Sequence, residues 1–162
     1  MAELTNMETK LGEVIGLAMA AQAATERVEG LTNDKTLAKA LKQMRKEAAQ
    51  AEKDGTAVAA SLNGKKSKIL AEARTVKTKG ATMMKTYLER GSDDLDGFEF
   101  LTMAEAGEVG HWSVLQELNK QAKHPGVRKL ISTHLPIQKR HLKDVMAGSL
   151  KLAAKEDANA KA

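Results

Sequence analysis

Six polar side chains occupy positions where two amphipathic helices should carry apolar residues. Apolar residues recur at spacings of three and four along residues 101–118 and again along 127–152, which is the pattern of one helix face. Three of the polar side chains interrupt each stripe. They are Glu105, Glu108, His111, His134, Gln138 and His141. Because an unpaired polar group is costly to bury, we expect these groups to meet partners or a metal ion.

The spacing of these residues is one that metal sites use. Glu108 and His111 form a Glu-x-x-His pair, and residues three apart share a helix face, so both can reach one ion. In di-iron bundle proteins two helices each supply such a pair, and two more helices supply one Glu each. Gln138 and His141 repeat the spacing on the other helix, with an amide in place of the acid.

The N-terminal half of the chain offers fewer ligands. Gln22 lies at the centre of one apolar helix face and Met44 at the centre of the next, where a carboxylate-bridged site would have charged groups. Glu26 and Glu47 lie only at the edges of these faces. Since a dinuclear iron site needs about four carboxylates to balance its charge, the ligand set is incomplete.

Three interpretations of the cluster follow. We prefer a metal-free network in which glutamine and neutral histidine bridge Glu105 and Glu108, with Gln22, Gln138 and His134 as core polar groups. The alternatives are one metal ion or a working di-iron or di-manganese site. The candidate metal ligands are Glu105, Glu108, His111, His141 and Glu47. We therefore expect no cofactor, with iron or manganese as the alternative.

Composition limits the fold and the compartment. The chain has 162 residues, 42% hydrophobic and only 2% aromatic, and its many Ala, Leu, Lys and Glu residues favour helices over sheets. It has no cysteine, which excludes disulfides, thiolate metal sites and cysteine nucleophiles. The N-terminal residues lack the pattern of a secretory signal, and no apolar stretch approaches a membrane span. We therefore expect a cytoplasmic protein that does not enter membranes.

Periodicity and cap residues predict four long helices and a helical crossover. The long helices are expected at 3–29, from a cap at 33–34 to 63, at 94–122 and at 127–155, with one or two shorter helices at about 63–92. The first helix has a row of small residues that would let a neighbouring helix approach closely. This row is Gly12, Gly16, Ala20 and Ala24.

Breaks and boundaries are also predicted. Asp54-Gly55 can interrupt the second helix, and Pro136 should kink or break the last one. We expect one domain over residues 1–155 and a disordered tail at 156–162.

Basic residues are concentrated in residues 61–90, which hold eight Lys or Arg against two Glu. Such a segment can bind nucleic acid weakly, through Lys65, Lys66, Lys68, Lys77 and Lys79. No aromatic residues are interleaved with it and no nucleic-acid motif accompanies it, so we prefer a solvated helix face.

The chain resembles the ferritin-like superfamily, and more narrowly the stress-induced bacterial ferritin-like proteins of the YciE/YciF type. Glu105-Ala106-Gly107-Glu108 followed by Trp112 is similar to the Glu-x-x-Glu and aromatic residue of that family's third bundle helix. The stretch 37–47 resembles its second helix, with Met44 where a His is usual and Glu47 retained.

Gln22 and Gln138 fall where the family usually has acids. The resemblance implies a ferritin-like four-helix bundle with a helical crossover. It also implies a cytosolic, stress-associated and commonly dimeric protein, whose di-metal centre is altered or lost.

We therefore expect a non-catalytic bundle protein with a degenerate di-metal site that acts by association with itself, as a dimer, or with another protein. The first alternative is an iron- or manganese-binding oxidase or peroxidase. The second is weak nucleic-acid binding through the basic segment at 65–79.

Overall fold

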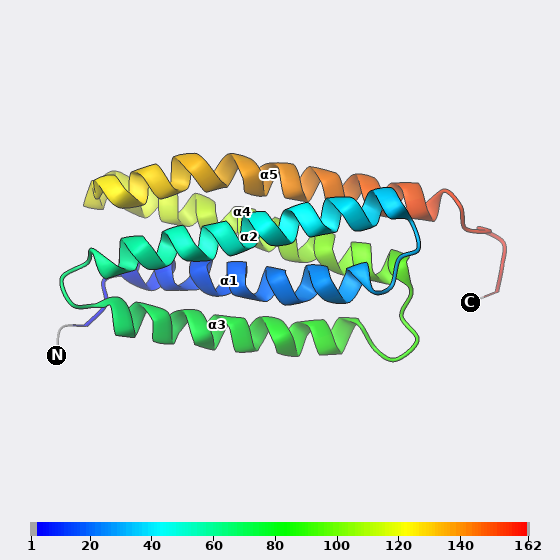
Figure 1. Cartoon of the computed structure of the whole chain (residues 1–162), viewed down its shortest axis with the longest axis horizontal. Helices are drawn as coiled ribbons and strands as arrows, with labels where there is room; N and C mark the ends of the chain where they lie inside the picture. Colours follow the sequence, from blue (N-terminus) through cyan, green and yellow to red (C-terminus); the bar gives the residue numbers. More distant parts are fainter. Residues whose placement is uncertain (1–2, 162) are drawn as a thin grey trace.

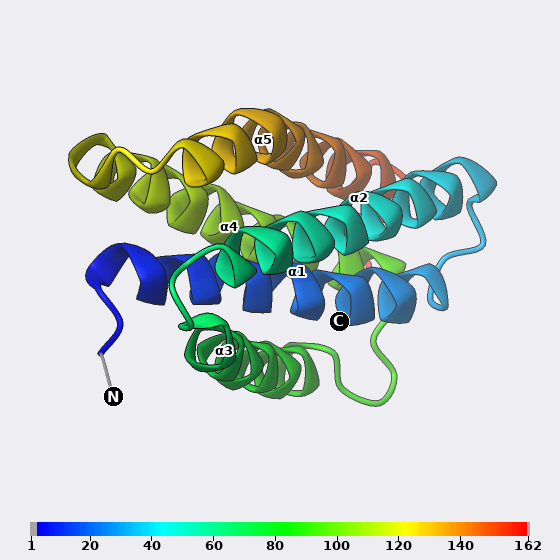
Figure 2. The ribbon, with the colours of Figure 1, turned by 60° about the vertical axis from the view of Figure 1, so that its left-hand side comes forward.

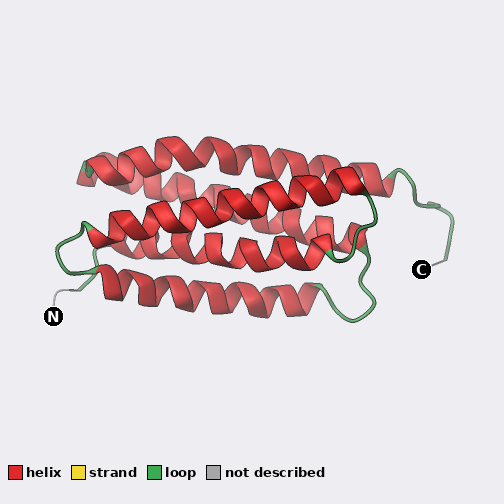
Figure 3. Cartoon of the chain, in the orientation of Figure 1, coloured by secondary structure: helices red, strands yellow, loops and turns green. Residues whose placement is uncertain are grey.

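The computed structural model describes residues 3–161 and consists of five α-helices joined by short loops (Figure 1). No strand occurs in this part of the chain (Figure 3). The helices are α1 (Asn6–Glu29), α2 (Lys35–Ala60), α3 (Lys66–Tyr87), α4 (Asp94–Ala122) and α5 (Pro125–Ala153). The all-α prediction is confirmed. None of the five helices combines the length and the apolar character needed to cross a membrane.

Side-chain caps account for most of the helix starts. Thr5 and Glu8 form a capping box at the start of α1, and Asp93 and Asp96 form another at the start of α4. Asp34 caps α2 by accepting two backbone N–H groups. His124 caps α5 through its ring Nδ1, which accepts from the Val127 N–H.

Helices α1, α2, α4 and α5 form a bundle, and α3 lies outside it against α1 (Figures 1 and 2). Only Ile69 and Ala73 of α3 are buried. Their packing depends on the predicted row of small residues. A Cβ added at Gly12 would lie 2.8 Å from the carbonyl oxygen of Ile69, and one at Gly16 would lie 2.4 Å from that of Ala73. The glycines thus allow the backbones of α1 and α3 to approach, as the sequence predicted.

Neither predicted break occurs. Helix α2 continues through Gly55, where Ile15 of α1 occupies the space that a Cβ would need, at 2.7 Å. Helix α5 continues through Pro136, which lies on its exposed side where water can satisfy the carbonyl that the proline leaves without a donor. The segment at 63–92 holds one long helix. Residues 156–161 are exposed and not helical, and residue 162 lies outside the described residues.

The core is divided into two apolar clusters along the bundle axis. The first is built around Leu11, Ile15 and Trp112, and the second around Leu41 and Leu101 with further residues of the same four helices. Between them, at the middle of the helices, lie the polar positions of α4 and α5. The fold therefore places a polar layer between two apolar ones.

Candidate functional site: a polar layer and an adjoining cavity

The polar layer centres on Glu105 of α4 and His141 of α5, which are 1% and 3% exposed. Gln138, one helical turn before His141, donates a hydrogen bond from Nε2 to Oε2 of Glu105. The ring Nδ1 of His141 lies 3.7 Å from the same oxygen. Two of the predicted residues on α5 thus converge on one predicted acid of α4.

The other side of the His141 ring faces α2. Its Nε2 lies 2.5 Å from Oε2 of Glu47, so the imidazole joins two carboxylates from different helices. Arg140 extends the network to the surface, because its Nη2 donates to both Glu47 oxygens at 2.8 Å. A chain of alternating charges therefore runs from the exposed guanidinium to the buried Glu105.

The electrostatics of this chain follow from burial and pairing. Burial alone would lower the pKa of His141, but the neighbouring Glu105 and Glu47 carboxylates outweigh it and raise that pKa. Burial likewise opposes ionisation of Glu47, yet hydrogen bonds from Gln43, His141 and Arg140 lower its pKa. The pairing thus favours a charged imidazole between charged acids. The expected network used a neutral imidazole between Glu105 and Glu108.

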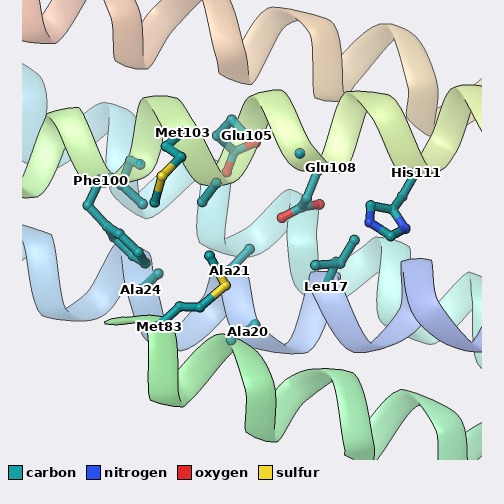
Figure 4. Close-up of a pocket in the computed structure, with 14 residues that line it drawn as sticks. Leu17, Ala20, Ala21, Ala24, Met83, Phe100, Met103, Glu105, Glu108 and His111 are labelled. Carbon is teal, nitrogen blue, oxygen red and sulfur yellow. The ribbon is translucent and has the colours of Figure 1, made fainter. Parts of the chain in front are cut away.

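Glu108 differs from the other members of the layer. It is 4% exposed, yet within residues 3–161 no group hydrogen-bonds to its carboxyl. Burial, and then the Glu105 carboxylate one turn away, raise its pKa well above the usual range. His141 does not bridge Glu105 to Glu108 as predicted, because the Glu108 side chain extends toward α1 rather than toward α5 (Figure 4).

The Glu108 carboxyl lines a cavity of about 190 Å³ between α1, α3 and α4 (Figure 4). Apart from Glu105, Glu108 and His111, the lining side chains are apolar or absent. They are Leu17, Ala20, Ala21, Ala24, Gly80, Met83, Phe100, Leu101, Met103, Ala104 and Gly107. Met83 and Met103 are the more exposed members, at 47% and 38%. The cavity is thus an apolar space with a single acid that has no partner.

Three predicted residues lie apart from the Glu105 network. His111 lies at the edge of the cavity with its Nδ1 2.9 Å from Glu13 of α1, so this side chain is paired before it could reach Glu105. Gln22 donates to Glu52 of α2 at 2.5 Å, on another face of α1.

His134 stacks on Trp112 with ring centroids 5.8 Å apart, and its Nε2 lies 2.8 Å from Asp54 of α2. It is buried, but the expected core polar network of Gln22, Gln138 and His134 is three separate sets of contacts.

Sequence reasoning missed several partners of the predicted residues. Asp54 and Glu52 of α2 and Arg140 of α5 were not identified as partners, although each contacts a predicted residue. One signal was available for Asp54. It follows Glu47 by seven residues, which places both acids on one stripe of α2, two turns apart and facing α5.

The contacts of the polar layer show how well a metal ion would fit there. Among the described residues, no three His, Asp or Glu side chains are grouped closely enough to hold one. Glu105 is engaged by Gln138, and the His141 Nε2 by Glu47. Glu108 is the one predicted ligand whose carboxyl is free to bind an ion. The donor set therefore fits a charge-balanced network better than a metal centre.

The basic segment lies on the outer helix. Lys65 pairs with Glu8 of α1 at 2.8 Å, whereas Lys66, Lys77 and Lys79 are exposed along α3.

Comparison with known proteins returns no match: no family model fits the chain, and no curated protein or solved structure is significantly similar.

Proposed function

We propose that this protein is a divergent ferritin-like bundle that has exchanged its di-metal centre for an internal ion network and acts by self-association. The direction of the helices supports the ferritin-like assignment. Helices α2 and α4 run the same way because α3 returns the chain along the bundle between them (Figure 1). A four-helix bundle with one long crossover is the topology of ferritin-like folds.

The contacts of His141 carry the proposal. A metal centre neutralises buried carboxylates with a cation, and here the imidazolium between Glu47 and Glu105 has that role. Gln138 satisfies Glu105 further, so the layer needs no ion to be stable. Among residues 3–161 no three His, Asp or Glu side chains are grouped to hold an ion, and no catalytic step is assigned to the layer.

The surface of α4 supports association between copies. From residue 100 to 116 the only charged side chains are Glu105 and Glu108, and both are buried. Met103, Gly107, Gly110 and Val114 are exposed and follow one another at spacings of four, three and four. This is the spacing of a helix-pairing seam, and the two glycines allow close approach. A second copy that placed its own α4 seam here would form a symmetric contact.

Two measurements test the proposal. Protein from iron- and manganese-replete medium should contain neither metal in stoichiometric amount, and chelation should leave its thermal midpoint unchanged. The proposal would be contradicted by a metal content near two ions per chain, as in di-iron bundles, if Glu108→Ala abolishes that content. Sedimentation should show a dimer. Gly110→Glu should dissociate this dimer, whereas Ala147→Glu, a change at an exposed position on α5, should leave it intact. A monomer at all concentrations would refute self-association.

A metal-binding function is the second candidate, and the free carboxyl of Glu108 favours it. One ion bound there would have Glu105 as its nearest further ligand, because this acid lies one turn away and lines the same cavity. Binding would require Glu105 to release Gln138. Iron or manganese should then raise the thermal midpoint of the wild type and not of Glu108→Gln.

A further inference from the structure

The cavity between α1, α3 and α4 combines two features that packing does not explain. Its walls come from small or apolar residues of three helices, so nothing fills the space of about 190 Å³. The single unpaired polar group that enters it is the carboxyl of Glu108, a residue that is only 4% exposed. Most buried polar side chains in proteins are hydrogen-bonded, so a buried carboxyl without a protein partner calls for an explanation.

The neighbouring positions show that the fold can satisfy an acid in this layer when it needs to. Glu105, one turn earlier, has Gln138 as a donor and His141 beside it. Glu108 has neither, because its carboxyl extends away from α5 toward α1, near Leu17 (Figure 4). An apolar side chain at position 108 would remove the cost of burying the acid. The geometry therefore places a hydrogen-bonding group inside an apolar space that is ready for an occupant.

We propose that this cavity binds a small uncharged organic molecule, with an apolar body against α1 and α3 and one hydroxyl group hydrogen-bonded to Glu108. The size of the cavity limits the occupant. An apolar cavity of about 150 Å³ holds one benzene molecule, so a body of roughly six to eight carbon atoms fits. Met83 and Met103 are flexible and partly exposed, and they form the side through which such a molecule enters.

Charge considerations favour an uncharged occupant. An anion would meet Glu105 and Glu108 and no free cation, because His111 at the edge is already paired with Glu13. An ammonium group has three donors to satisfy and loses its hydration in an otherwise apolar space. A hydroxyl group requires only the single partner that Glu108 offers, because it can donate to a carboxylate or accept from a protonated carboxyl.

The test uses 1-hexanol as the probe, with hexane, hexylamine and hexanoate at equal concentration. Binding is followed by the methyl resonances of Met83 and Met103 in the full chain. We expect saturable shifts with 1-hexanol, weaker binding of hexane by the value of one hydrogen bond, and no saturable shifts with hexylamine or hexanoate. Glu108→Leu should weaken hexanol binding about three- to tenfold, the value of one hydrogen bond, and Glu117→Gln, an exposed acid of the same helix, should not. Ala104→Phe should fill the cavity and abolish binding.

Several outcomes would overturn the proposal. They are an absence of saturable shifts, tighter binding of hexylamine or hexanoate, and a hexanol affinity that Glu108→Leu leaves unchanged. Met103 and Gly107 belong to both the cavity lining and the α4 seam, so a second copy is a rival occupant. If hexanol binds only after Gly110→Glu separates the copies, the second copy fills the cavity and the proposal fails. Equal binding by wild type and Gly110→Glu supports it, whatever the outcome for self-association.

Discussion

Glu105 and Glu108 lie one turn apart on α4, and their neutralisation should change the free energy of unfolding in opposite directions. Glu108→Gln removes a buried ionisable carboxyl that nothing in residues 3–161 hydrogen-bonds. Glu105→Gln keeps an oxygen that can accept from Gln138, but it removes the charge from that acceptor and one of the two carboxylates beside His141. We expect the first change to stabilise the protein at neutral pH and the second to destabilise it by about 1–3 kcal/mol.

The pH dependence gives the sharper result. Burial and Glu105 raise the pKa of Glu108 in the folded state above the unfolded value of 4.5. Between these two pKa values the folded state binds more protons than the unfolded state, so wild-type stability falls as the pH rises above 4.5. The slope approaches about 1.4 kcal/mol per pH unit for one group. Glu108→Gln should remove this loss and leave stability below pH 4.5 nearly unchanged.

Urea unfolding at half-unit intervals from pH 4 to pH 8 measures this difference, with Glu117→Gln as a matched control because Glu117 is exposed. The gain from Glu108→Gln should grow with pH, whereas the control should follow the wild type. If Glu108→Gln is destabilising at every pH, or keeps the wild-type slope, then the carboxyl has a partner and both the cavity and its acid have been misinterpreted.

Three further outcomes are expected. Because the pKa of His141 is raised, its pairing with Glu47 stabilises the fold fully below pH 6.5, and this stabilisation is lost as the pH rises through the pKa of the folded state. His141→Gln should flatten that decline in urea titrations. Gly16→Ala should lower the thermal midpoint measured by circular dichroism, because the added Cβ would lie 2.4 Å from the Ala73 carbonyl oxygen. The expected loss in the free energy of unfolding is about 1–3 kcal/mol. Ala23→Ser, on the exposed side of α1, should leave the midpoint unchanged. Retention of DNA by the basic face of α3 should fall steeply with salt if the nucleic-acid alternative holds; an affinity unchanged from low to moderate salt removes it.

Periodicity predicted helices α1, α2, α4 and α5 well because each one buries a continuous stripe, whereas α3 buries only two residues. It also identified Glu105, Gln138 and His141 as inward-facing, since all three interrupt apolar stripes. His111 shows where this reasoning ends. Three residues of helix turn through about 300°, so each step of three drifts by about 60°. Two such steps after Glu105, His111 reaches the edge of α4 and pairs with Glu13.

The partners of the polar residues required more than periodicity. Gln22 was placed in the core, yet it pairs with Glu52 because of the axial register between α1 and α2, which no single helix specifies. The same is true of His134 and Asp54. Glu47 was recognised at an edge, and its role depends on α5 passing close enough for His141 to reach it. Which residues face inward is local information, whereas what they meet depends on the packing of two helices.

The layered core gives a physical reason to look for function at the middle of the bundle. The two apolar clusters already supply the packing that holds the four helices together, one on each side of the polar layer. Replacing a buried ion network by apolar side chains of similar volume is often neutral or stabilising, so stability alone does not account for keeping Glu105 and His141. Register is one reason, because the charged chain from Arg140 to Glu105 fixes the axial positions of α2, α4 and α5 relative to one another. Glu108 contributes nothing to that register, since it contacts none of these partners. Its burial beside this cavity is therefore the feature of the layer that register does not explain and that the proposed occupant accounts for.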